Sequence, residues 1–231
     1  MSEKKKWSMW RDPNVYIGVG IAVIVIPTLI YAIVTHVRRP DELGDFLYED
    51  IGGERTKLTL ATPPTKDGPI WEVIADDSVD MKILELAINR WHQKTQKRVF
   101  RYRQSQEFFD HPMYLLAGDP TVKQAANYRF GTVGVRVFTE GGGEACGGVT
   151  HHSYDLKTGR VWWADISINP MYTHDEKSYE AALVHELGHA LLLGHHDHRS
   201  SIMRKKLNVR GTITDHHSKL VKGLWTTEQH R

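Results

Sequence analysis

Apolar and polar residues alternate in three short stretches of the chain, at residues 70–74, 99–103 and 134–138. This alternation, rich in β-branched and aromatic side chains, is typical of strands. Between the first two stretches, apolar residues from Val79 to Trp91 recur every three or four positions, as in a helix that packs one face on a core. The pattern therefore predicts the order strand, helix, strand in this part of the chain.

The second half of the chain repeats both patterns. Residues 148–154 and 160–169 have strand-like composition and are separated by the turn-forming residues 155–159, which predicts a hairpin. A helix is predicted over residues 179–193, and Thr214 is placed to cap a last helix. The apolar face of that last helix consists of Leu220, Val221, Leu224 and Trp225.

Residues 15–34 form a run of twenty positions without a charge. A helix of that length, rising about 1.5 Å per residue, spans a hydrocarbon core of about 30 Å. Pro27 lies inside the run, and membrane helices tolerate proline. The alternative is a cleavable signal peptide, but its apolar region would be about 7–15 residues long and would end at small residues, which residues 31–36 do not provide. We therefore predict an uncleaved signal anchor over residues 15–35, embedded in the lipid bilayer.

Basic residues predict the orientation of this span. Four of them lie in the basic N-terminal segment, residues 1–14, whereas Arg38 and Arg39 are the only two in the fifteen positions after the span. The excess favours a cytoplasmic N-terminus and a single-pass membrane protein whose later residues are extracytoplasmic. Residues 36–67 contain many glycines and prolines and little apolar periodicity, so they are predicted to be a linker. Residues 68–231 then form one folded domain.

Composition adds few constraints. The chain has 231 residues, of which 40% are hydrophobic and 25% charged, and this fits one globular domain with an appendage. Its single cysteine, Cys146, excludes an intrachain disulfide, and its formal net charge of +2 does not indicate a charged partner. The sequence has no nucleic-acid-binding motif, and residues 104–128 show no functional pattern.

The most specific chemistry in the chain lies in the motif H-E-x-x-H, which begins at His185 and ends at His189. Two histidines four positions apart on a helix leave the same face, so both imidazoles can bind one Zn²⁺ at about 2.0–2.1 Å. His195 can supply a third ligand if the chain bends just after Leu192 or Gly194. Three protein ligands leave one coordination position for water, which is the arrangement of a catalytic zinc.

Glu186 lies beside this predicted zinc. A bound zinc lowers the pKa of its water toward about 7 and polarises the scissile carbonyl, and Glu186 can take the proton of that water as a general base. The chemistry indicated by these residues is metal-assisted hydrolysis. The alternative is a helix that carries two histidines and a glutamate by chance.

The motif, with His195 six residues further on and Met203 eight residues after that, resembles the metzincin zinc proteases, most closely the matrixin branch. The resemblance covers about residues 68–225. It implies that the three histidines bind one catalytic zinc, that Glu186 is the base, and that Met203 forms a tight turn beneath the metal. It also implies an α+β, metzincin-like zincin fold with a mixed twisted sheet, an active-site helix and a C-terminal helix, preceded here by the transmembrane helix.

The first strand of the predicted hairpin corresponds by position to the sheet edge over the metzincin cleft. An extended substrate adds to that edge as a further strand through main-chain hydrogen bonds. The resemblance therefore implies five substrate-binding residues, Gly148, Val149, Thr150, His151 and His152. A second zinc held by His151 and His152 is an alternative, but adjacent residues in a strand face opposite ways.

The chain departs from the family at Leu192, where the family has the glycine that permits the turn out of the helix. A non-glycine residue in the left-handed conformation costs about 1–2 kcal/mol, which a zinc site can absorb. Gly194 is the alternative position for the bend. His196 and His198 are close enough in the sequence to compete with His195 for the metal.

These observations lead to the hypothesis of a membrane-anchored zinc endopeptidase that cleaves a protein or peptide substrate. One alternative is a deuterolysin-like zincin with Asp215 as the third ligand, against which Met203 argues. Another is a non-catalytic adhesion or assembly domain that holds zinc, against which Glu186 argues because a purely structural site needs no general base. The basic residues 204–206 predict either solvated surface or a preference for acidic substrate residues.

Overall fold

The computed structural model describes residues 44–61, 64, 68–105, 132–137 and 147–225. The chain divides into two units, residues 1–38 and 39–231, and every described residue belongs to the second. The predicted signal anchor, residues 15–35, and most of the 104–128 segment lie outside the described residues. Within the described part of the chain, no helix is long and apolar enough to cross a membrane.

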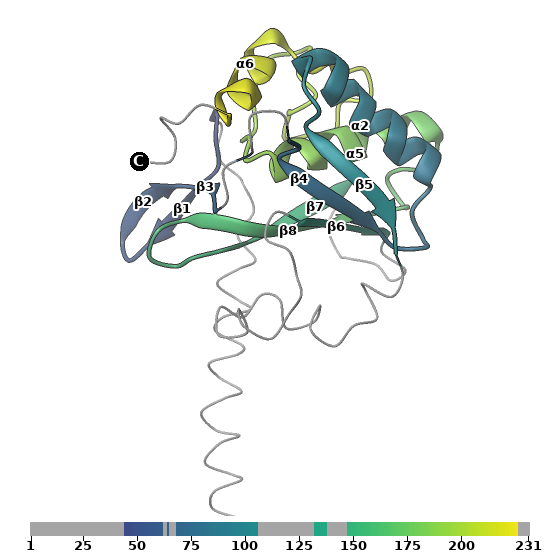
Figure 1. The fold of residues 1–231 in the computed structure, drawn as a ribbon. Coiled ribbons are helices and arrows are strands. Elements are labelled where there is room, and N and C mark those ends of the chain that lie inside the picture. The colour runs from purple at the N-terminus through teal and green to yellow at the C-terminus, as the bar shows by residue number, and fades with distance from the viewer. Residues whose placement is uncertain (1–43, 62–63, 65–67, 106–131, 138–146, 226–231) are drawn as a thin grey trace, which may run out of the picture. The chain divides into compact units, whose positions relative to one another are not determined.

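A six-stranded mixed sheet forms the centre of the described chain (Figure 1). Its strands are β3 (Thr59–Leu60), β4 (Trp71–Ala75), β5 (Phe100–Gln104), β6 (Thr132–Val137), β7 (Gly148–Tyr154) and β8 (Arg160–Ile168). The strand order is β3-β8-β6-β4-β5, and β7 pairs with β8. The β7–β8 pair is antiparallel, and the other pairs of this sheet are parallel. The predicted hairpin and the three predicted earlier strands are therefore confirmed.

Among the described residues, three helices accompany the sheet: α2 (Met81–Thr95), α5 (Glu176–Ala190) and α6 (Asp215–Gly223). Figure 1 shows α2 and α5 side by side over one face of the sheet. Trp91 of α2 is fully buried, and its indole N–H donates to the backbone oxygen of Val184 in α5 at 3.0 Å. This bond joins the two helices inside the core. The α+β class predicted from the sequence is confirmed.

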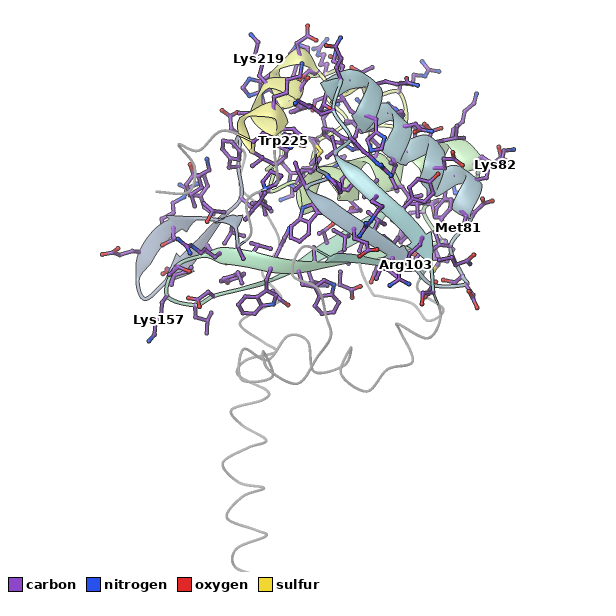
Figure 2. The ribbon with its side chains drawn as sticks, in the orientation of Figure 1. Met81, Lys82, Arg103, Lys157, Lys219 and Trp225 are labelled. Atoms are coloured by element: carbon purple, nitrogen blue, oxygen red, sulfur yellow. The ribbon has the colours of Figure 1, made fainter. Side chains whose placement is uncertain are left out.

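The two later helices begin at residues that satisfy their free N–H groups. Asp175 caps α5 by accepting from Ser178 N–H at 2.8 Å, so the helix begins three residues before the predicted start at residue 179. Thr214 caps α6, as predicted. Figure 2 shows Lys219 on the outer side of α6, while the indole N–H of Trp225 donates to the Gly68 oxygen at 3.3 Å.

The chain before β4 is part of the folded unit. A two-stranded antiparallel sheet, β1 (Tyr48–Ile51) and β2 (Glu54–Lys57), precedes β3, which pairs with β8. Three leucines of this region, Leu47, Leu58 and Leu60, are buried in the core. The prediction of a linker over residues 36–67 is therefore wrong for residues 44–61. The three leucines are irregularly spaced along the chain, so they give no sustained periodic pattern, although all three belong to the core cluster.

Residues 44–47, here called the docking segment, lie against the chain that follows α5. Gly44 N–H donates to the His195 oxygen at 2.8 Å, and Leu47 N–H donates to the Leu192 oxygen at 2.9 Å. An antiparallel bridge between Phe46 and Leu193 lies between these two bonds. The docking segment thus holds the backbone of residues 192–195 from one side.

Gly194→Ala should disturb this contact. A methyl group at Gly194 would overlap the Gly44 oxygen and lie 3.0 Å from the Phe46 oxygen. Both are backbone atoms of the docking segment, whose N–H groups at Gly44 and Leu47 are bonded to residues 192–195. Overpacking of this kind costs about 1–3 kcal/mol. The expected result is a lower melting temperature with faster amide exchange at Leu47.

Gly44→Ala is the matched control, because its methyl group would meet only the Phe46 oxygen, at 3.7 Å. It should melt like the wild type. Equal melting temperatures for the two variants and the wild type would contradict the close approach at Gly194.

Candidate metal centre

Helix α5 brings two histidines to the same buried point. His185 and His189 lie one turn apart, and their side chains are 6% and 3% exposed. His195, which is 8% exposed, faces them from the chain beyond the helix. The ring centroids of His185 and His189 are 4.6 Å apart, and that of His195 lies 5.3 and 4.8 Å from them. The ligand atoms of the three lie within 4.8 Å of one another, so the group is able to bind one metal ion.

Backbone oxygens orient the two helical rings. The Nδ1 atoms of His185 and His189 lie 2.8 Å from the backbone oxygens of Ile202 and Leu193, so each N–H can donate there and each Nε2 keeps its lone pair. The two Nε2 atoms are 3.0 Å apart. Two nitrogens about 2.05 Å from one tetrahedral zinc are separated by about 3.3 Å, so a metal ion fits between them with a small adjustment. Burial lowers the pKa of both rings, which keeps them in the neutral form that binds metal.

The chain leaves α5 by a bend at Leu192. Its φ of +64° is left-handed, and its side chain is almost completely buried. Leu192 N–H donates to the His189 oxygen at 2.7 Å, and Leu193 N–H donates to the Gly188 oxygen at 3.1 Å. The alternative bend at Gly194 is wrong, since Gly194 has no positive φ and is instead the residue that the docking segment approaches.

Met203 lies directly under the metal-binding turn of α5. Its side chain is fully buried, and its sulfur occupies the space that a methyl group at Gly188 would need. His196 N–H donates to the Met203 oxygen at 2.7 Å, while Met203 N–H donates to Ser201 Oγ at 2.9 Å. The first of these bonds connects the turn that carries Met203 to the residue after His195, and the second lies within that turn.

The side chain of Glu186 contacts strand β7. Its carboxylate is buried, and Thr150 Oγ1 lies 2.6 Å from Glu186 Oε2 and 3.1 Å from the Glu186 backbone oxygen. Burial raises the pKa of Glu186 to about 7, and the hydrogen bond from Thr150 opposes that rise. A methyl group at Gly148 would lie 2.9 Å from Glu186 Cγ. Strand β7 therefore makes room for the carboxylate and orients it, a role that the sequence analysis did not assign to Gly148 or Thr150.

The other predicted substrate-binding residues also lie on β7. His152 is the next residue after Thr150 on the face toward α5, and its Nε2 lies 2.9 Å from the His189 oxygen. Burial lowers the pKa of His152 to about 4, so the ring is neutral and donates this hydrogen bond. Val149 and His151 alternate with these residues and are half-buried. Within the described residues, neither His151 nor His152 belongs to a group that could hold a metal.

The competing third ligands lie elsewhere. Asp215 is exposed, and its carboxylate is 2.6 Å from Lys94 Nζ, so the deuterolysin-like alternative is wrong. His198 is exposed and its Nδ1 lies 2.9 Å from Ser200 Oγ. His196 turns toward α6 instead of the buried group. The structure thus brings His195 alone of these candidates to His185 and His189.

Comparison with known proteins gives only remote similarities. No protein-family profile matches the sequence, and no curated protein matches it. Archaemetzincin from Methanopyrus kandleri is 13% identical with a TM-score of 0.43, over 70% of this chain and 97% of its own. A zinc-dependent peptidase from Methanocorpusculum labreanum is 13% identical with a TM-score of 0.37, over 65% of this chain and 99% of its own. These values assign neither a family nor a function, and they do not single out the matrixin branch.

His195→Ala should lose its bound metal at neutral pH, because two histidines alone hold zinc far more weakly than three. Loss of a ligand should exceed the roughly 10–100-fold effect of changing a residue that only orients one. His198→Ala and Asp215→Ala should keep the metal of this centre. Dialysis against a weak chelator followed by metal quantitation compares the variants, and loss in Asp215→Ala with retention in His195→Ala would refute the three-histidine centre.

Proposed function

We propose that this protein is a zinc-dependent endopeptidase. The observation that carries the proposal is the buried group of His185, His189 and His195, together with the buried side chain of Glu186 on the same helix. Three imidazoles suit zinc among the common biological metals and leave a coordination position for a reactant.

The residues of this centre have separate roles in the proposed hydrolysis. Zinc, when bound, supplies a Lewis acid that activates water and polarises a peptide carbonyl. The three histidines that would hold it are almost completely buried. Glu186 accepts the proton of the attacking water, and a carboxylate pKa near 7 suits both the uptake of that proton and its later release to the departing amine. Thr150 holds one carboxylate oxygen through its hydroxyl and leaves the other for the water.

Strand β7 is the proposed binding edge for the peptide. It pairs with β8 along one side, and among the described residues no strand pairs with its other side. An extended peptide can add there by main-chain hydrogen bonds. The contacts of Gly148 and Thr150 with Glu186 support this proposal, because the same strand contacts the proposed base.

The non-catalytic alternative, a zinc-holding adhesion or assembly domain, explains these observations less well. A structural zinc is usually closed by four protein ligands, whereas three histidines meet here. A buried carboxylate is also costly, since burial disfavours its charged form, and a purely structural zinc site does not need one. The enzymatic function accounts for both features.

Glu186→Gln should abolish peptide hydrolysis while zinc stays bound, because the residue acts on water and is not a ligand. Loss of a general base typically lowers the rate by about 10²–10⁴-fold. Peptide-library cleavage and metal quantitation on the same preparation test this. Glu176→Gln, at the exposed start of the same helix, is the matched control and should cleave normally. Wild-type turnover in Glu186→Gln would show that another group is the base.

We also propose that residues 15–35 anchor the protein in a membrane, with residues 40–231 on the extracytoplasmic side. The uncharged run and the basic excess before it support this. Protease added outside intact cells should digest the domain and spare the N-terminal segment. A mature soluble form that begins near residue 36 would contradict the anchor.

A further inference from the structure

Three polar side chains from distant parts of the sequence meet on the surface beside the candidate metal centre. Asp45 comes from the docking segment, His196 follows the third histidine of the buried group, and His216 lies in the first turn of α6. Their ligand atoms all lie within 4.8 Å of one another. We propose that these three residues form a second zinc site, which ties the docking segment and α6 to the turn that carries His195.

The donor set and its geometry fit a transition metal. His216 Nε2 lies 2.7 Å from Asp45 Oδ1, and the rings of His196 and His216 have centroids 5.5 Å apart. Two imidazoles and one carboxylate are a common set of ligands for zinc. The side chains of Asp45 and His216 are 51% and 45% exposed, so water can complete the coordination.

An ion pair between Asp45 and His216 is the simpler reading of this contact. Such an exposed pair contributes little stability, and it does not account for the position of His196. Nδ1 of His196 accepts a hydrogen bond of 3.2 Å from the N–H of His198. This nitrogen is therefore unprotonated, and a metal bound there would displace only one long hydrogen bond.

The backbones that carry the three residues are held in place without a metal. The docking segment is fixed at Gly44, whose N–H donates to the His195 oxygen, and His196 N–H donates to the Met203 oxygen. His216 belongs to a helix whose start is capped by Thr214. A site on fixed backbones loses little conformational entropy when the metal binds.

His217 is next to this cluster but is not one of the ligands. Its ring is buried, with Nε2 3.5 Å from Ser201 Oγ, and its Nδ1 accepts from Thr214 N–H at 3.3 Å. Both nitrogens are thus directed into the fold. His216, the exposed residue next to His217 in the sequence, is therefore the ligand that α6 supplies to the cluster.

A consequence of this site concerns the third ligand of the buried centre. His195 and His196 are adjacent, and the docking segment bonds to the backbone oxygen of His195. A zinc ion held by Asp45, His196 and His216 would cross-link the docking segment and α6 to the residue that follows His195. Binding to the folded state alone stabilises it according to the metal concentration relative to Kd.

The test is a titration of metal-free, full-length protein in detergent with Zn²⁺, followed by equilibrium dialysis and metal quantitation. The wild type should take up two zinc ions per chain, and the second should raise the melting temperature. Asp45→Asn and His216→Ala should each keep the first zinc and bind the second more than about tenfold more weakly. The retained first zinc reports that these variants are folded.

His198→Ala is the matched control, since it removes a nearby exposed histidine outside the cluster, and it should bind two zinc ions. Uptake of one zinc by the wild type, or of two with unchanged affinity by both cluster variants, would overturn the second site. Peptide cleavage separates this result from the proposed function. Two bound zinc ions without cleavage would support the second site and contradict the peptidase. Cleavage with only one bound zinc would support the peptidase and contradict the second site.

Discussion

Three imidazoles can share one cation only if the chain reverses direction between His189 and His195, and it does so at Leu192. The left-handed φ of this leucine costs about 1–2 kcal/mol. Burial of a leucine side chain contributes about 1.5–3 kcal/mol, and the Leu192 side chain is 1% exposed. Packing therefore offsets the strain. A glycine would remove the strain at this position and also remove the buried side chain, which explains how a non-glycine residue is tolerated.

The surroundings of this bend hold it from several sides. Met203 fills the space under Gly188, the docking segment bonds to the backbone of residues 192–195, and Trp91 fixes α5 against α2. These groups contact the parts of the chain that carry the histidines and do not belong to the three-histidine group itself. They restrict the positions of the histidines, so the centre can be formed before a metal arrives.

The part of the site that follows a fixed spacing could be predicted from the sequence. His185 and His189 share a helix face because they are four residues apart, and Met203 was predicted from the family spacing. The bend was located only as a choice between Leu192 and Gly194, because either position allows the chain to turn. The structure shows that Gly194 is small for a different reason, the approach of a segment about 150 residues earlier in the chain.

Contacts between distant segments could not be predicted in this way. The bond between Thr150 and Glu186 depends on the packing of β7 on α5, and no local pattern records it. The docking segment begins with Gly44 and Asp45, residue types typical of a linker, and its backbone hydrogen bonds depend little on its side chains. For the same reason the meeting of Asp45 with His196 and His216 has no signal in the sequence.

The account depends most directly on where a metal binds. Crystals of the protein prepared with one equivalent of zinc can be measured on both sides of the zinc absorption edge, which locates the ion independently of any assumed ligand. The account predicts one strong anomalous peak about 2.0–2.1 Å from a ring nitrogen of each of His185, His189 and His195, with Glu186 outside bonding distance. A peak bound by Glu186, or one that lacks His195, would contradict it.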